Sequence, residues 1–294
     1  MIIIRMQGGL GNQLFQYALY ETFRQKGIET RVDISAYEDG REKRELGLAK
    51  LGLSPEIADR QQLHRYYADN TLLTDRTFRY LFGRKKYRKE KMYDFNPHIL
   101  TVTDGFLSGY WQSEKYFASA AQEVRKRICF QDIDTKEVKS REKQLQKTNA
   151  VSVHIRLGDY LQTAELYGNI CTGVYYRKAI QYIAGRIENP VFYVFSDEPE
   201  RAKDVLKGYQ CCFISENRGA DSYKDMYLMS RCRHHIIANS TFSWWGAWLD
   251  DRPDKIVITP PKWNHLCQSH DICCEGWIMV EPEDTVKSQL SAGE

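Results

Sequence analysis

The stretch VSVHIRLGDY, residues 151–160, combines an interior strand with charged side chains at its carboxyl end. Side chains alternate between the two faces of a strand, so His154 and Arg156 lie on the face opposite the apolar valine and isoleucine. An unpaired guanidinium inside a protein is very costly. We therefore expect Arg156 to meet an anion or to open onto a cleft.

This strand begins a regular alternation of strands and helices that predicts a doubly wound parallel sheet. The second strand, PVFYVF, is apolar on both faces, as in a sheet covered on both sides. We expect Ser222 and Asp225 to form a capping box at the start of one helix. The predicted strands are 151–156, 190–195, 211–215, 234–238 and 255–259, and the predicted helices are 172–188, 198–208, 221–232 and 242–249.

The N-terminus reads as the start of a second Rossmann-type unit. A strand (1–6) precedes a glycine-rich loop (7–13), a helix with apolar residues at i, i+4 spacing (14–27) and another strand (30–35). Asn12 is the expected N-cap of this helix, and Gly27 stands where a left-handed C-cap residue belongs.

The region between the two units is harder to interpret. Residues 41–116 predict helical insertions, and the polar stretch 131–149 predicts a surface helix or linker. We place the domain boundary there. The predicted domains are 1–148, on the acceptor side, and 149–294, which binds the donor nucleotide.

Composition describes a globular chain of 294 residues with 42% hydrophobic and 28% charged residues. Its net charge of +3 is too near balance for a dedicated nucleic-acid binder and fits a small anionic ligand. No apolar run is long enough to cross a membrane, and Arg5 interrupts the first one too early for a signal peptide. We therefore expect a cytoplasmic protein.

The cysteines and acidic pairs do not predict a metal site. Eight cysteines in a long cytosolic chain are expected to be reduced thiols. The pair Asp132 and Asp134 falls in the polar linker and reads as solvated surface. One group loosely imitates a zinc site but lacks a Cys-x-x-Cys pair: His265, Cys267, His270, Cys273 and Cys274.

Two further strand ends carry polar residues, and ligands of parallel sheets bind beyond such ends. Ser196-Asp197-Glu198 could accept N–H bonds from a base or a sugar, or simply cap the next helix. The segment 239–242, Asn-Ser-Thr-Phe, could bind an anion at a helix start, or again only cap it. Trp245 and Trp248 in that helix have core spacing.

The glycine loop is a weak dinucleotide fingerprint, because Leu14 stands where the third glycine belongs. It remains a turn that lets the backbone approach a ligand closely. Together with the strand ends it suggests a nucleoside diphosphate held between two Rossmann-like halves. The alternative for Arg156 is an internal salt bridge, for example to Asp159.

Four blocks, GGLGNQLFQYA, HIRLGDY, FSDE and NSTFSWWGAWL, resemble the bacterial α-1,2-fucosyltransferases, glycosyltransferase family 11. The resemblance implies a GT-B-like α/β fold, with two Rossmann-type domains facing across a cleft. It also implies GDP-fucose as donor, a galactoside or lipid-linked glycan as acceptor, inversion at the anomeric carbon, and no required metal or cofactor.

The resemblance further implies roles for individual residues. Arg156 would hold the diphosphate, His154 would position the nucleotide, and Asp197 or Glu198 would read guanine. The family's usual second arginine is replaced by Leu157, so another cation must supply that contact. The other residues implied to bind the donor are Gly9, Gly11, Asn12, Gln13, Asn239, Ser240, Thr241 and Phe242.

Three assignments go beyond the donor. Asp159 is our hypothesis for the general base, with fixing of its own loop as the alternative role. Tyr110 and Trp111 could stack on an acceptor sugar, although aromatic residues are more often core. The basic run 84–91 reads as solvated surface, or as a peripheral contact with the inner membrane.

Other functions remain open on the sequence. The same fold could transfer fucose to an α-1,6 or α-1,3 position, or bind a glycan or nucleotide without catalysis. The combination of Arg156, Asp159 and the glycine loop argues against a silent binder, because binding alone needs no base beside a diphosphate clamp.

Overall fold

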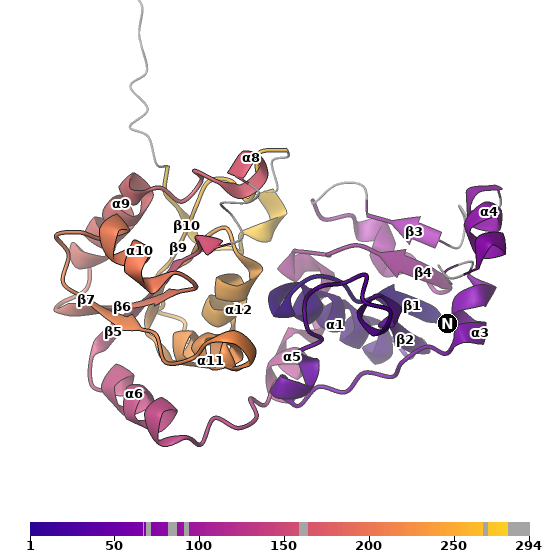
Figure 1. Ribbon diagram of the computed structural model, residues 1–294, viewed down its shortest axis with the longest axis horizontal. Coiled ribbons are helices and arrows are strands. Elements are labelled where there is room, and N and C mark those ends of the chain that lie inside the picture. Colours follow the sequence, from indigo (N-terminus) through magenta and orange to yellow (C-terminus); the bar gives the residue numbers. More distant parts are fainter. Residues whose placement is uncertain are drawn as a thin grey trace, which may run out of the picture.

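The computed structural model describes residues 1–66, 68, 72–81, 87–90, 94–158, 164–266 and 270–281. The described strands form two sheets, and every strand pair in both is parallel. Figure 1 shows them in two lobes, with the indigo and magenta N-terminal lobe beside the orange C-terminal lobe. The predicted α/β class with two Rossmann-type halves is confirmed.

The first sheet has the strand order β2-β1-β4-β3. Its central strand β1 is fully buried at Ile2, Ile3 and Ile4, because it pairs on both edges and is covered on both faces. The strands are β1 (Ile2–Arg5), β2 (Thr30–Asp33), β3 (Tyr87–Lys89) and β4 (Gly105–Ser108). The helices of this half are α1 (Leu10–Gln25), α2 (Ser35–Glu38), α3 (Arg60–Arg65), α4 (Leu73–Leu81) and α5 (Ala121–Arg127).

The second sheet has the order β10-β9-β8-β5-β6-β7, and all five strands predicted for this half are present. The pattern does not predict the short sixth strand, β10. The strands are β5 (Asn149–Ile155), β6 (Pro190–Ser196), β7 (Cys211–Ile214), β8 (His234–Ile236), β9 (Val257–Thr259) and β10 (Ile278–Met279). The helices are α6 (Lys136–Gln146), α8 (Ala164–Tyr167), α9 (Gly173–Ala184), α10 (Pro199–Val205), α11 (Tyr223–Arg231) and α12 (Thr241–Leu249).

Short 3₁₀ turns connect these elements: η1 (Leu48–Leu51), η3 (Pro97–Thr101), η4 (Glu114–Tyr116), η5 (Ala118–Ala120), η6 (Gly219–Asp221) and η7 (His270–Ile272). Most lie in the N-terminal half, where the sequence pattern is weakest.

Strand β6 is apolar on both faces because both faces are covered. Phe192 and Val194 pack with residues of α9 and α10, whereas Tyr193 and Phe195 pack with residues of α6 and α11. Helix α6 therefore lies against the second sheet, although it precedes residue 149 (Figure 1). The exact division between the two domains stays a prediction.

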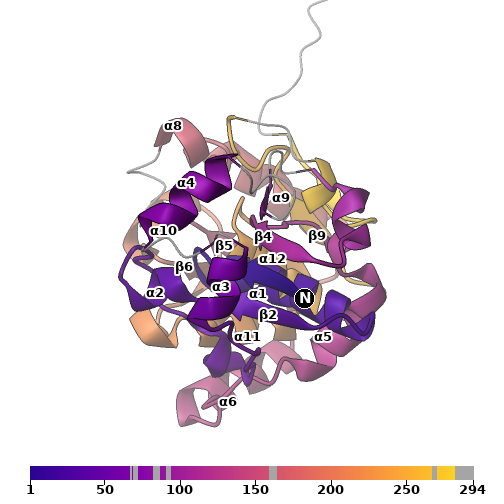
Figure 2. The same cartoon turned by 90° about the vertical axis from the view of Figure 1, so that its right-hand side faces the viewer.

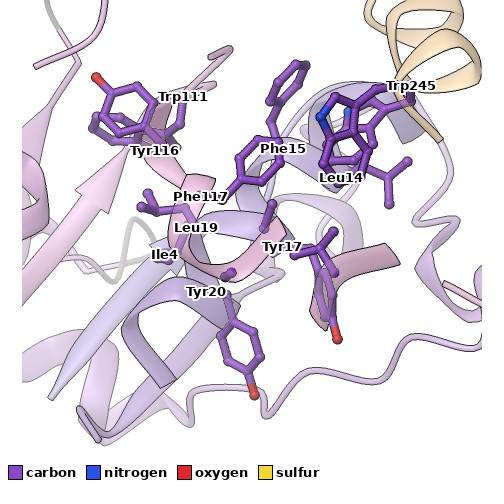
Figure 3. Close-up of a cluster of buried hydrophobic side chains, with 14 of the residues drawn as sticks. Ile4, Leu14, Phe15, Tyr17, Leu19, Tyr20, Trp111, Tyr116, Phe117 and Trp245 are labelled. Atoms are coloured by element: carbon purple, nitrogen blue, oxygen red, sulfur yellow. The ribbon is translucent and has the colours of Figure 1, made fainter. Parts of the chain in front are cut away.

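Helix α12 follows strand β8 of the second sheet but packs into the core of the first half. The ring centroids of Trp244 and Trp245 lie 4.5 and 5.1 Å from that of Phe15 on α1. Phe117 stacks on Trp245 at 5.5 Å (Figure 3). Figure 2 shows α1 at the centre of the N-terminal lobe with α12 behind it. The two halves thus share one hydrophobic core.

Gly11 allows α1 and α12 to come this close. A Cβ atom at position 11 would lie 2.6 Å from both the carbonyl carbon and Oγ1 of Thr241. The indole Nε1 of Trp245 also donates to the carbonyl oxygen of Gly11 at 2.9 Å. The sequence assigns the glycine loop to a ligand, which stays a prediction; this glycine also admits the partner helix.

Two predicted caps are wrong and one is confirmed. Helix α1 has Gly9 rather than Asn12 at its N-cap, because the chain turns into the helix earlier than the polar residue. Ser222 is already helical, with ψ −25°, and its side chain makes no capping bond. Asp225 therefore belongs to no capping box. Gly27 has φ +72°, as expected just after a helix.

We predict that Gly11→Ala lowers the free energy of unfolding by ~1–3 kcal/mol, because the new methyl group must push the Thr241 backbone away. Urea denaturation measures this loss. Gly9→Ala is the matched control, because a Cβ there meets no atom within 4 Å. Equal stability of the two variants would contradict a tight contact at Gly11.

Candidate active site

A cavity of about 730 Å³ lies between the two halves. Residues at the carboxyl ends of β5, β6 and β8 line it from one side, and the loop that opens α1 lines it from the other. The three polar strand ends and the glycine loop predicted from sequence are therefore brought together in one space. This volume suits a ligand larger than a single sugar.

Arg156 lines this cavity just beyond β5. Its Nη1 lies 3.0 Å from Oδ2 of Asp197, which follows β6. Because β5 and β6 are neighbours, with Ile155 opposite Ser196, the two side chains are fixed by strand register. The internal salt bridge considered from sequence is thus present with Asp197. Asp159, the partner suggested there, lies outside the described residues.

Asp197 also holds the loop that carries Arg156. Its Oδ1 accepts the backbone N–H of Leu157 at 2.9 Å, and its Oδ2 accepts that of Gly158 at 3.0 Å. Both oxygens are therefore engaged by the chain itself. Glu198, the other predicted guanine reader, is not among the described residues that line the cavity.

His154 is a buried, neutral imidazole in the cavity wall. Burial, and then the nearby positive charge of Arg156, lower its pKa to about 3. Its ring packs beside Phe242 at 5.9 Å, and its Nδ1 has no hydrogen-bond partner among the described residues. The neutral imidazole can therefore form a hydrogen bond with a ligand but adds no positive charge to the cavity.

The start of α12 forms another part of the wall. Ser240 is the N-cap residue, and no side chain caps the helix there. Asn239 is fixed by its own contacts, because its Nδ2 donates to the carbonyl oxygens of Tyr167 and Trp263. The helix start thus offers backbone N–H groups and the hydroxyls of Ser240 and Thr241 to an anion.

The residues of the glycine loop have different parts. Asn12 lines the cavity and accepts a hydrogen bond from Nε2 of Gln112 at 2.8 Å. Gln13 is fully buried and ties the loop together, since its Nε2 donates to the carbonyl oxygens of Gly8 and Glu45. Gln13 does not line the cavity. The sequence reasoning missed Gln112, although it stands beside the aromatic pair.

The two predicted acceptor residues separate. Tyr110 lines the cavity, whereas Trp111 is 1% exposed and packs against Tyr116. Glu90 accepts the backbone N–H of both, at 2.6 and 3.2 Å, and holds Trp111 at φ 56°. Burial raises the pKa of Glu90 to about 7. Acceptor binding stays a prediction, with Tyr110 in position to take part.

Asn217 and Asp225 line the same cavity and were not predicted as site residues. Nδ2 of Asn217 donates to Oδ1 of Asp225 at 2.7 Å. Burial raises the pKa of Asp225 from its ordinary 3.8 to about 7. An acidic residue among the mostly apolar buried positions of α11 is the signal that could have identified it.

The remaining predictions concern metals and membranes. Among the described residues no three His, Cys, Asp or Glu side chains cluster as a metal site, and Cys267 of the zinc-like group lies outside them. Asp159 lies outside the described residues too, so its role as base stays a prediction.

Of the basic run 84–91 the structure describes 87–90, where Arg88 and Lys89 are exposed. In the described part of the chain, no helix could span a bilayer.

Comparison with known proteins identifies relatives over the full length. The model of glycosyl transferase family 11 matches residues 1–281. An α-1,2-colitosyltransferase of Escherichia coli is 32% identical, with 96% of this chain and 99% of that protein covered. The O-antigen biosynthesis glycosyltransferase WbnK of E. coli is 31% identical, with 93% and 98% covered. The human galactoside α-(1,2)-fucosyltransferase 1 is 29% identical, with 57% and 50% covered.

Solved structures give a more distant likeness. The fucosyltransferase NodZ from Bradyrhizobium has a TM-score of 0.45 at 14% identity, with 84% of this chain and 92% of that chain covered. The E. coli ADP-heptose heptosyltransferase II has a TM-score of 0.43 at 11% identity, with 95% and 89% covered. At these scores the likeness does not bear on the site.

We predict that Asp197→Asn makes the backbone N–H groups of the loop after β5 more accessible to solvent. The asparagine amide cannot accept hydrogen bonds from all three groups that bind the carboxylate, namely the Arg156 guanidinium and the N–H groups of Leu157 and Gly158. Loss of a charge-assisted bond should speed amide hydrogen exchange at Leu157 and Gly158 about tenfold or more. Glu198→Gln is the control and should leave both rates unchanged. Unchanged exchange in Asp197→Asn would refute this clamp.

We predict that Asp225→Asn stabilises the protein in a pH-dependent way. The folded state keeps a proton on Asp225 up to about pH 7, whereas the unfolded state releases it near pH 3.8, so wild-type stability falls across this interval. Asparagine cannot ionise. The stability difference should grow from pH 4 to 7 and then level off, with ~4 kcal/mol as its upper limit.

Denaturation of both proteins between pH 4 and 8 measures this difference. Asp221→Asn, at an exposed carboxylate in the same loop region, serves as the control and should show only a small difference. A pH-independent difference for Asp225→Asn would show that the carboxyl is ionised at no cost.

Proposed function

Because this chain belongs to glycosyl transferase family 11 and is a glycosyltransferase, we propose that it transfers L-fucose from GDP-β-L-fucose to the 2-hydroxyl of a terminal galactose or related sugar. One observation supports this most strongly. The guanidinium of Arg156 lines the cavity between the halves and is oriented there by Asp197. Its planar fork suits a diphosphate.

The proposed reaction is a displacement with inversion. The acceptor oxygen attacks the anomeric carbon of fucose, while the bond from that carbon to the β-phosphate oxygen of GDP breaks on the opposite face. Negative charge builds on GDP as the sugar leaves. Arg156 and the N-terminus of α12 both line the cavity. In this proposal they stabilise that charge as it develops, without having to move first.

His154 contributes to this proposal as a neutral group. A protonated imidazole would repel Arg156, and burial opposes protonation as well. Its unpaired Nδ1 can hydrogen-bond to the nucleotide and hold it against Phe242. We therefore assign His154 to positioning the nucleotide, without proton transfer.

The proton of the acceptor hydroxyl requires a base. Asp159 remains our hypothesis, because it follows Arg156 by three residues in the sequence. On the N-terminal side, Tyr110 and Gln112 line the cavity and are available to an acceptor sugar. The proposal assigns no step to a metal ion.

A second candidate donor sugar is colitose, because one of the full-length relatives is an α-1,2-colitosyltransferase. An assay that offers fucosyl and colitosyl donors separately distinguishes the two. Reading the product linkage by NMR distinguishes α-1,2 from α-1,6 or α-1,3 transfer. We propose that the acceptor is a glycan, displayed on a lipid carrier at the cytoplasmic side of the inner membrane.

We predict that Arg156→Lys lowers kcat for transfer about 100-fold, because lysine keeps the charge but loses the planar fork that contacts the developing anion. GDP release from GDP-fucose in the presence of a galactoside measures this rate. Arg201→Lys, at an exposed position on α10, is the matched control and should keep the wild-type rate. A kcat within threefold of wild type in Arg156→Lys would overturn the assignment.

A further inference from the structure

Beyond the diphosphate site, the cavity extends to the edge of the second sheet. The loop after β7 contributes Asn217, and the first turn of α11 contributes Asp225. Neither residue contacts Arg156 through a hydrogen bond among the described residues, and the mechanism above does not use them. This end of the cavity therefore needs an explanation of its own.

Asp225 is 9% exposed, yet only one of its oxygens has a protein partner. Oδ1 accepts from Nδ2 of Asn217 at 2.7 Å, and Oδ2 accepts no hydrogen bond from any described residue. A buried carboxylate with an unused oxygen costs stability. Stability of the fold alone would favour an apolar side chain at position 225. A buried carboxylate there is therefore expected to bind a ligand.

Apolar side chains, two of them aromatic, line the same cavity as Asp225. Met229 lies one helical turn further along α11, and Phe195 and Phe242 line the cavity from β6 and α12. These four residues combine a carboxylate with side chains that can cover the faces of a planar ring. Nucleobases are bound in this way, by hydrogen bonds at one edge and apolar contacts on the faces.

The chemistry of the carboxylate selects among bases. Guanine presents two adjacent N–H donors, at N1 and N2, on its Watson–Crick edge, and these match the two acceptor oxygens of an ionised carboxylate. Adenine presents a donor beside an acceptor at that edge, and the acceptor would face the carboxylate unfavourably. Hypoxanthine keeps the N1–H donor and lacks the amino group at C2.

The residue expected from sequence to read guanine, Asp197, is engaged elsewhere. Its two oxygens bind Arg156 and the backbone N–H groups of Leu157 and Gly158. We propose, on the basis of the proposed function, that Asp225, oriented by Asn217, reads the guanine edge of the donor nucleotide. Asp197 then acts as the residue that positions Arg156.

Calorimetric binding of GDP, IDP and ADP to the wild-type chain and to Asp225→Asn tests this assignment at pH 8. The wild-type protein should bind GDP about 10- to 100-fold more tightly than IDP, and ADP more weakly still. Asp225→Asn should bind GDP about 10- to 100-fold more weakly than wild type and should bind GDP and IDP within threefold of each other. Its stability should match or exceed that of wild type.

Two controls separate charge from position. Asp221→Asn removes a nearby exposed carboxylate and should leave GDP affinity unchanged. Asn217→Ala keeps the carboxylate but removes its orienting bond, so it should weaken GDP binding less than Asp225→Asn and should preserve part of the preference for GDP over IDP.

The outcomes distinguish this proposal from the proposed function. A wild-type protein that binds neither GDP nor IDP would overturn both. A wild-type protein that prefers GDP, together with an Asp225→Asn variant that keeps the same ratio of GDP to IDP affinity, would overturn the guanine assignment alone. If that variant weakens GDP and IDP equally but leaves 2′-deoxy-GDP unchanged, the carboxylate binds the ribose, and the assignment is also wrong.

Discussion

The docking of α12 onto α1 is the contact on which the rest of the molecule depends. Helix α12 belongs to the second sheet by connectivity, but its indole rings fill the core of the first half against Phe15 and Phe117. The contact requires Gly11, since a side chain there would collide with the backbone of Thr241. The same helix start forms one wall of the cavity, so the packing of the two halves and the shape of the cavity depend on one element.

Two ionisable side chains that line the cavity are buried, and burial disfavours their charged forms. Burial holds His154 neutral and raises the pKa of Asp225, because both groups lose water on burial. A buried serine, histidine and aspartate (Ser152, His235 and Asp250) show the contrast, since each is hydrogen-bonded to the next and none lines the cavity. The hydrogen-bonded groups support the fold, whereas the unpartnered Nδ1 of His154 belongs to a residue that lines the cavity.

Local pattern was sufficient to predict most of the second half. Apolar stretches of five or six residues and amphipathic helices between them predicted β5 to β9 and α9 to α12, because each element buries a face that its own periodicity marks. The motifs also predicted that Arg156, Asp197 and Ser240 meet, since parallel strands place their carboxyl ends at one edge. Two of the three predicted helix caps are wrong, because Asn12 bonds to Gln112 far along the chain and Asp225 bonds to Asn217 in the preceding loop.

The sequence by itself thus determined the two parallel sheets, the family and the strand ends that carry the polar residues. Only the tertiary structure decided the partners of the individual residues. Asp197 binds Arg156, Gly11 lets α12 pack closely against α1, and Gln13 hydrogen-bonds to the carbonyl oxygen of Gly8 in its own loop. The physical reason is that periodicity reports which face of an element is buried. It does not report which distant side chain or backbone N–H group completes a hydrogen bond, since that depends on how separate elements pack.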